Sequence, residues 1–163
     1  MVDKILVSPL DLALTLIGTT ETPGSRSTAI ILAMLQSVNS SVTDDEVAWC
    51  SALPNFIFGL LKLPRSKSLR ARSWLNVGTS VPLIDAEPGF DLCIFKRGEG
   101  PQPDKTVIDA PGHVAFFVAD LGNLVRVFGG NQSDAIGYGR FPAEDLLDIR
   151  RIVAVQPVNI PVG

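Results

Sequence analysis

The sequence has few of the side chains that bind metal ions. It contains one histidine, His113, and two cysteines, Cys50 and Cys93, and it has neither the HExxH nor the CxxC spacing of common zinc sites. A chain of 163 residues with 46% hydrophobic content can also build a core without a disulfide bond. We therefore expect two reduced thiols, no bound metal and no cofactor.

Long runs of one charge are also missing. The 14 basic and 17 acidic side chains give a net charge of −3, and the longest run of like charge is Asp44-Asp45-Glu46. A nucleic-acid partner requires a basic stretch or face, and the sequence offers none. We therefore expect no nucleic-acid binding and interpret the acidic run as helix caps and solvated surface.

The apolar N-terminal segment, residues 1–18, is too short to cross a membrane. Asp3 and Asp11 interrupt it, and no small-residue cleavage site follows. This pattern predicts neither an integral membrane segment nor a signal peptide. Synthesis in the cytoplasm is the expectation.

The length and apolar content favour a single domain over residues 1–163. Helical periodicity dominates its first half, over about 9–78, and Ser8-Pro9 is a typical helix start. A third helix is expected to start near Cys50, and it can contain Pro54 only in its first turn or at a kink. The predicted helices cover residues 9–18, 27–38, the region after Cys50, and 68–76.

The second half, over about 88–156, has short runs of β-branched and aromatic residues between glycines and prolines. The predicted strands cover residues 91–95, 113–119, 124–128, 135–140 and 150–156. Helices followed by consecutive strands predict an α+β fold with an antiparallel sheet.

Cys50 and His113 are the candidates for a nucleophile and its base. A helix N-terminus and an adjacent imidazole both lower the pKa of a thiol, and the patterns place Cys50 near a helix start and His113 at a strand start. The residues alone also allow a small buried cysteine and a structural histidine. Cys93 lies inside an apolar strand and fits a buried role better.

A third polar group is needed to orient the imidazole. The stretch from Gly129 to Asp134 follows the strand expected beside that of His113, and Asn131 is the first choice within it. An ordinary glycine-rich turn accounts for the same residues.

Six segments, in order over about residues 10 to 151, resemble the papain-like cysteine peptidoglycan hydrolases of the CHAP and NlpC superfamily, especially small single-domain lysin-type members. In this sequence the segments are Glu21-Thr22-Pro23-Gly24-Ser25, Asp45-Glu46-Val47-Ala48-Trp49-Cys50-Ser51-Ala52, Ala71-Arg72-Ser73-Trp74-Leu75-Asn76, Pro88-Gly89-Phe90-Asp91, Gly112-His113-Val114 and Gly129-Gly130-Asn131-Gln132-Ser133-Asp134. The chain departs from the pattern at Leu53-Pro54, where relatives have a Phe-Val pair, and at the inserted Phe90.

The resemblance implies a papain-like fold, in which a helical lobe carrying the nucleophile packs on a small antiparallel sheet carrying the base. It assigns the nucleophile to Cys50, the general base to His113 and the orienting group to Asn131, with Gln132 and Asp134 as alternatives for the last. The residues expected to contact the substrate are Trp49, as a wall of the cleft, together with Ser51, Gln132 and Asp45.

The activity that the resemblance implies is hydrolysis of amide bonds in peptidoglycan stem peptides, by an endopeptidase or an N-acetylmuramoyl-L-alanine amidase. Such an enzyme acts on the cell wall after release or delivery, as an endolysin or a secreted effector, and an immunity protein or a virion component is a conceivable partner. Two other hypotheses stay open: a non-catalytic papain-like binding or assembly module, and another thiol acyl-transfer enzyme on the same scaffold.

Overall fold

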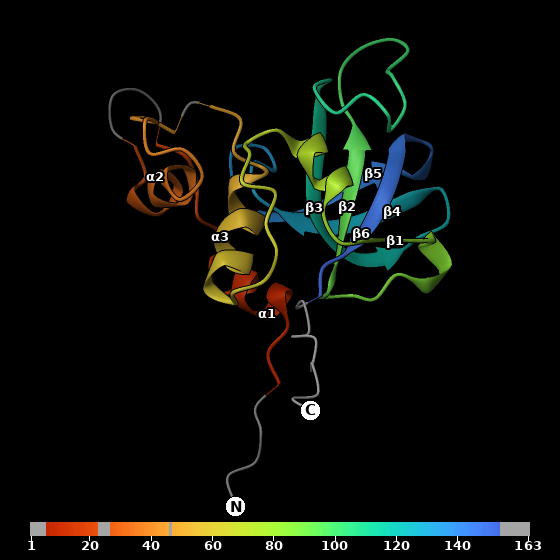
Figure 1. The fold of residues 1–163 in the computed structure, drawn as a ribbon, viewed down its shortest axis with the longest axis horizontal. Coiled ribbons are helices and arrows are strands. Elements are labelled where there is room, and N and C mark those ends of the chain that lie inside the picture. The colour runs from red at the N-terminus through yellow and green to blue at the C-terminus, as the bar shows by residue number, and fades with distance from the viewer. Residues whose placement is uncertain (1–5, 23–26, 46, 154–163) are drawn as a thin grey trace, which may run out of the picture.

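The computed structural model describes residues 6–22, 27–45 and 47–153, and Figure 1 shows helices beside a sheet. The helical elements are α1 (Pro9–Leu14), α2 (Ala29–Gln36), α3 (Ala52–Leu60) and the 3-10 helices η1 (Ala71–Asn76), η2 (Leu83–Asp85) and η3 (Ala143–Asp145). The strands are β1 (Thr79–Val81), β2 (Asp91–Lys96), β3 (Gly112–Asp120), β4 (Leu124–Gly129), β5 (Gly137–Pro142) and β6 (Leu146–Arg151). The α+β prediction is thus confirmed.

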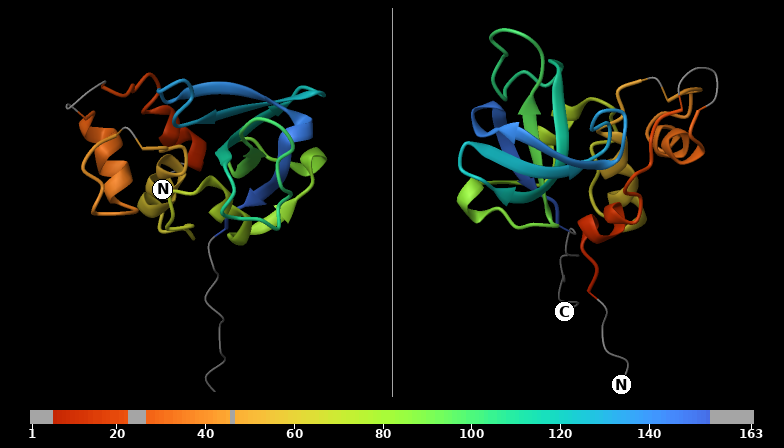
Figure 2. Two further views of the ribbon diagram at one scale, coloured as in Figure 1. Left: turned by 90° about the horizontal axis from the view of Figure 1, so that it is seen from above. Right: turned by 180° about the vertical axis from the view of Figure 1, so that it is seen from behind.

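Within the described residues, six strands form one antiparallel sheet in the order β1-β6-β2-β3-β4-β5. Consecutive strands β2 to β5 pair as neighbours, while β6 returns to lie between β1 and β2. Register shifts between Ile94 and Phe95 and between Phe117 and Ala119 mark irregular points, which increase local twist. The sheet is strongly curved when seen from above and from behind (Figure 2).

Side chains on the two faces of the sheet form two separate apolar clusters, because successive residues of a strand point to opposite faces. The first cluster joins the sheet to the helices and contains Ile94, Val114 and Phe116 together with residues of α2 and α3. The second lies on the other face and contains Phe95 and Ala115. The two faces of β3 therefore belong to different apolar clusters.

The start of α3 resolves the question raised by Pro54. The helix begins at Ala52 with Ser51 as its N-cap, so Pro54 is the third helical residue. Backbone N–H groups in the first turn have no intrahelical acceptor, and proline costs little there. Cys50 therefore lies directly before the N-cap, two residues before the first helical residue.

Most predicted elements exist, but several boundaries differ. Ser8 caps α1 as expected, and Asp11 makes a reciprocal contact with it. The helix ends at Leu14, and turns continue it to Gly18. Segment 68–76 becomes the 3-10 helix η1, β5 starts two residues late, and β6 is shifted toward the N-terminus. The sequence patterns missed β1, whose three residues are too few to show a period, and residues 154–156 of the last predicted strand lie outside the described residues.

A buried ion pair joins the start of β2 to the end of β6. The Asp91 carboxylate has no exposed surface and accepts from Arg151 Nε and Nη2, each at 2.8 Å, and from the Glu87 backbone N–H at 2.7 Å. Three strong donors compensate the desolvation of the carboxylate. Asp91, in the step that resembles Pro-Gly-Asp, is therefore a structural residue.

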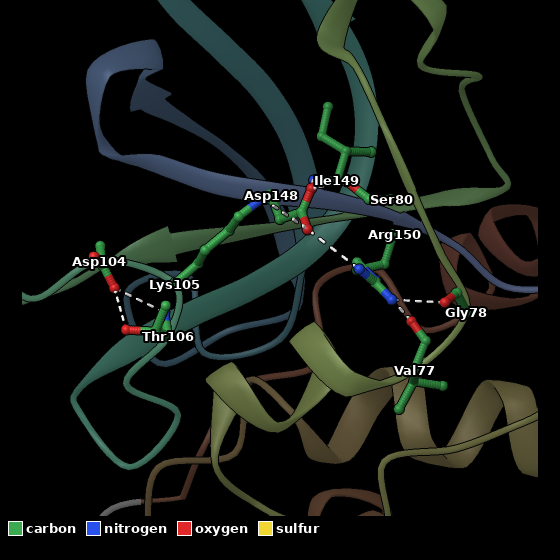
Figure 3. A network of polar contacts seen from close by, with 9 residues as sticks. All are labelled: Val77, Gly78, Ser80, Asp104, Lys105, Thr106, Asp148, Ile149 and Arg150. Carbon is green, nitrogen blue, oxygen red and sulfur yellow. Dashed lines mark hydrogen bonds and ion pairs between the residues drawn. The ribbon is translucent and has the colours of Figure 1, made fainter.

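Figure 3 shows a second polar network, on β6. Arg150 donates to the carbonyl oxygens of Val77 (2.9 Å) and Gly78 (2.6 Å), and its Nη1 lies 3.3 Å from the Asp148 carboxylate. The other Asp148 oxygen accepts from Ser80 Oγ at 2.6 Å. The network fixes the connection from η1 to β1 against β6.

Among the described residues, no helix combines the length and apolar character needed to traverse a lipid bilayer.

Candidate active site

A cleft of about 1060 Å³ opens between the helical part and the sheet. Its volume is at the upper end of the range for ligand sites, so it can hold several residues of a peptide. The lining includes Cys50, Asn131, the segment 67–71 after α3, Arg97 after β2, and the segment 109–112 before β3. Segments far apart in the sequence thus meet around the predicted nucleophile.

Cys50 lies at the floor of this cleft with 2% of its surface exposed. The backbone N–H groups of Val114, Cys50 and Ser51 lie near the thiol and favour its charged form. Burial raises the pKa of the Cys50 thiol, while these donors and the Arg97 cation act in the opposite direction. The resting group is a neutral thiol.

His113, the second residue of β3, is equally buried, with 2% exposed. Its ring stacks on Phe141 with a centroid distance of 4.7 Å, and its strand neighbour on β2 is Phe95. Burial lowers the pKa of His113 to about 4, and the Arg97 cation lowers it as well. The imidazole is therefore neutral at neutral pH and can accept a proton.

The structure brings Cys50 and His113 to the same end of β3. Cys50 belongs to the cluster on the helical face, whereas alternation along β3 puts His113 on the face of Ala115. The backbone N–H of Val114, the residue after His113, lies near the Cys50 thiol. Within the described part of the chain, no hydrogen bond joins the thiol and the imidazole, which is common for catalytic pairs before substrate binds.

The residue that contacts His113 is Gln132, not Asn131. Gln132 Nε2 lies 3.0 Å from His113 Nε2, while Asn131 lines the cleft with a left-handed backbone (φ 55°). Asn131, Ser133 and Asp134 all have positive φ, so the chain turns sharply at this point and sends the side chain of Gln132 inward. The alternative that the sequence left open for the orienting group thus fits the geometry better.

Three residues predicted to contact substrate do not reach the cleft surface. Trp49, Ser51 and Asp45 have no exposed surface, so none can touch a bound molecule in this structure. The prediction is corrected for a physical reason: all three side chains are buried by packing and hydrogen bonds inside the protein.

Each of the three has a structural contact instead. Trp49 Nε1 donates to the Glu21 carboxylate, and its ring packs so closely on Gly130 that a Cβ there would lie 2.6 Å from it. Asp45 accepts from the Thr28 backbone N–H, just before α2, at 2.8 Å. Ser51 bonds to the Ser68 carbonyl oxygen and to Trp74.

Asn55 and Ser51 hold the cleft wall that follows α3. Asn55 Nδ2 donates to Ser68 O (3.1 Å), and its Oδ1 accepts from the Lys67 N–H (2.9 Å). Ser51 Oγ donates to the same Ser68 oxygen at 2.7 Å and accepts from Trp74 Nε1 at 2.9 Å. Three of these hydrogen bonds fix the segment that carries Lys67 to the start of α3, and the fourth joins Ser51 to η1.

Arg72 holds the opposite wall, the long connection between β2 and β3. This guanidinium has no exposed surface; Nε donates to Pro111 O (2.8 Å) and Nη1 to Pro103 O, Asp104 O and Val107 O (3.0, 2.8 and 3.1 Å). Gly112 lies directly against it, because a Cβ there would approach Arg72 Cγ to 2.9 Å. Arg72 therefore sets the path of the chain into His113.

The sequence patterns did not single out Asn55 or Arg72. Both lie in helical segments whose periodicity shows a buried position but not its long-range partners. The signal available was a polar side chain on an otherwise apolar helical face, since such a group must find hydrogen bonds when buried. No group of three or more His, Cys, Asp or Glu side chains in the described part of the chain is arranged to hold a metal ion.

Solved structures of NlpC and P60 domains share this architecture. NlpC1 from Trichomonas vaginalis matches with a TM-score of 0.51 and 16% sequence identity, over 89% of this chain and 43% of that chain. The P60 domain of M. avium subspecies paratuberculosis antigen MAP1204 matches with a TM-score of 0.50 and 13% identity, over 88% of this chain and 91% of that chain. The P60 domain of M. avium paratuberculosis antigen MAP1272c gives 0.49 and 17%, over 90% and 91%.

No family model matches the sequence, and no curated protein sequence matches it. This chain spans less than half the length of NlpC1, and all three identities lie below 20%. The likeness therefore concerns the fold. It confirms what the six sequence segments predicted at that level: the chain has the papain-like α+β fold of NlpC and P60 domains.

Proposed function

We propose that the protein is a cysteine hydrolase that cleaves amide bonds in the stem peptides of bacterial peptidoglycan. The observation that carries the proposal is the position of the Cys50 thiol: at the floor of a peptide-sized cleft, just before α3, and near the backbone N–H of the residue that follows His113. The fold shared with NlpC and P60 domains supports it.

The neutral state of both groups favours general-base catalysis over a preformed ion pair. The Cys50 sulfur attacks the carbonyl carbon while His113 takes the thiol proton, and the C–N bond then breaks as the imidazolium gives this proton to the leaving amine. Water, deprotonated by His113, hydrolyses the thioester and restores the thiol. Backbone N–H groups at the start of α3 stabilise the oxyanion.

Gln132 suits the orienting role in this scheme. An amide turned by 180° exchanges its oxygen and nitrogen in place, so Gln132 can accept from His113 Nε2–H. That arrangement fixes the tautomer and leaves Nδ1 to take the thiol proton. Asn131 then lines the cleft beside the substrate.

The experiment is release of soluble fragments from purified sacculi. Cys50→Ala and His113→Ala should each reduce release to background while the far-UV spectrum stays native. Cys93→Ala is the matched control, because Cys93 is buried in β2 and burial strongly raises its pKa, so activity should persist. Full activity of Cys50→Ala would contradict the proposal.

Mass spectrometry of the fragments distinguishes the bond. A new amino terminus within the stem identifies an endopeptidase, and a free lactyl group on the sugar identifies an amidase. We further propose that the protein acts on the wall after release or delivery, as an endolysin or effector.

The deep burial of Cys50 and His113 favours one competing hypothesis, a non-catalytic module that retains the fold. Such a module would bind sacculi in a pull-down without releasing fragments, and its binding would be unchanged in Cys50→Ala.

A further inference from the structure

Strand β5 is one edge of the sheet, and the chain itself pairs along the approach to this edge. In the connection between α1 and α2, Thr20 forms an antiparallel bridge with Ala135. The Ile136 N–H donates to Thr19 O at 2.8 Å, and Ile136 O accepts from the Gly18 N–H at 2.9 Å. This short ladder ends at the residue before β5. The edge is thus able to take a strand, and the chain's own segment does not continue along β5.

The next backbone groups along this edge have no partner in the part of the chain that the structure describes. Bonding alternates along a strand, and the Ala143 N–H donates to Asn123 O at 2.9 Å, so the odd-numbered residues of β5 bond to β4. Tyr138 and Arg140 therefore direct their N–H and C=O groups outward, in line with those of Ile136. Both residues are exposed. A strand from another molecule can extend an edge of this kind.

The face of β4 and β5 that carries Tyr138 also holds two arginines directly opposite each other. Arg126 and Arg140 are register partners in a non-hydrogen-bonded pair, the kind in which side chains lie closest. They are the only charged residues of the two strands, and neither forms an ion pair with a described residue. Arg126 lies over the Tyr138 ring, 4.5 Å from its centroid. Like charges directly opposite destabilise a sheet, and a carboxylate placed beside them would offset that cost.

This charge also decides which kind of strand fits the edge. Antiparallel pairing of two β5 edges would bring the Arg126 and Arg140 side chains of both copies together, so four like charges would meet. A second copy of the chain is therefore a poor occupant. A strand with acidic side chains on the same face meets two unpaired cations instead.

We propose that the outer edge of β5 binds an extended segment of another protein that carries acidic side chains at alternate positions. Hydrogen bonds to the backbone of Tyr138 and Arg140 pair the strands, and carboxylates beside Arg126 and Arg140 select the partner. Directly opposite residues of an antiparallel pair share a face, so the partner's acidic residues are those whose N–H groups point at β5. These residues of β4 and β5 are not among those that line the cleft, so the inference does not rest on the proposed function.

The test is an NMR titration of the isotope-labelled full chain with acetyl-Thr-Glu-Val-Glu-Val-Glu-amide and with a counterpart that has lysine in place of each glutamate. The largest amide shifts should fall on Tyr138 and Arg140, with a Kd on the order of 1 mM or tighter for the acidic peptide. The basic counterpart should bind roughly 10-fold more weakly, because two favourable charge contacts become repulsive.

Methylation of the peptide nitrogens tests the geometry without altering the protein. Methyl groups on the three glutamate nitrogens remove the donors that face β5 and should abolish binding. Methyl groups on the two valine nitrogens, which face away from β5, should change the Kd by about 2-fold or less. This difference separates strand addition from simple attraction between charges.

Arg140→Gln should reduce the preference for the acidic peptide to about 3-fold or less, whereas Lys62→Gln, an equal charge change on the exposed turn after α3, should keep it. Absence of shifts at Tyr138 and Arg140 with about 5 mM peptide would overturn the proposal, as would equal affinities of the acidic and basic peptides or of the two methylated forms. Dimerisation in sedimentation equilibrium that shifts the same two amides would assign the edge to a second copy and overturn it as well.

Discussion

The buried centre of the site and the rim of the cleft both carry ionisable side chains, but the two sets differ in their exposure to water. Cys50 at the floor and His113 on the opposite face of β3 are almost fully buried, and burial is the main cause of the pKa shift of each. Lys67, Arg70 and Arg97 at the rim are exposed and unpaired among the described residues. Water screens the rim charges but not the floor, so a change at the floor should alter stability and turnover, and one at the rim mainly ligand choice.

The largest effect on stability is expected from the buried guanidinium of Arg72, which holds the β2–β3 connection in place. Arg72→Met removes the donor of four hydrogen bonds to backbone carbonyls and should lower the free energy of unfolding by about 4 kcal/mol in urea denaturation. Arg70→Met, two residues earlier and exposed, should change it by about 0.5 kcal/mol or less. Equal losses for the two variants would remove the contrast between floor and rim.

A pH dependence of stability should follow from His113. Its pKa is about 4 when folded and about 6.5 when unfolded, so the unfolded chain binds the proton more readily. The contribution is complete above pH 6.5 and is lost as the pH falls toward 4, by on the order of 3 kcal/mol.

His113→Gln isolates this contribution, because the chain has no other histidine. The difference in unfolding free energy between wild type and variant should change across pH 4 to 6.5 and be constant above it. A constant difference over the whole range would show that the imidazole is not held neutral by burial.

A smaller effect is expected at the turn over residues 131–134, which contacts His113 through Gln132 and lines the cleft through Asn131. Gln132→Ala removes the contact to His113 Nε2 and should lower kcat about 10-fold with little change in KM, whereas Asn131→Ala should change kcat by about 3-fold or less. Steady-state kinetics on a soluble stem peptide measures both. A larger loss for Asn131→Ala would return the orienting role to the residue first predicted from the sequence.

The sequence was most informative where a local rule decides the structure. Ser8 caps α1, Pro54 falls in the first turn of α3, and the alternating strands β2 to β4 appear close to their predicted positions. Capping, proline geometry and strand period act over a few residues, so they can be recognised without tertiary information. The candidate pair of Cys50 and His113 came from such local context together with the order of the six segments.

Details that depend on long-range packing could not be predicted in the same way. The inward side chain after Gly130 is Gln132 and not Asn131 because three neighbouring residues adopt positive φ, which no residue type there demands. Trp49 was expected to wall the cleft, but its close packing on Gly130 buries it. Such outcomes depend on which distant residues pack against each side chain, and the periodicity of the sequence does not contain this information.

The position of the Val114 N–H beside the Cys50 thiol ties assembly of the reactive centre to the register of one strand. Slippage of β3 by a single position would reverse the face on which His113 lies and remove the donor next to the sulfur. Neither a newly made chain nor one with a misaligned sheet contains the centre, because its parts come from segments that meet only in the finished fold. Timing of activity is thus built into folding: the chain becomes chemically competent only once the sheet is correctly aligned.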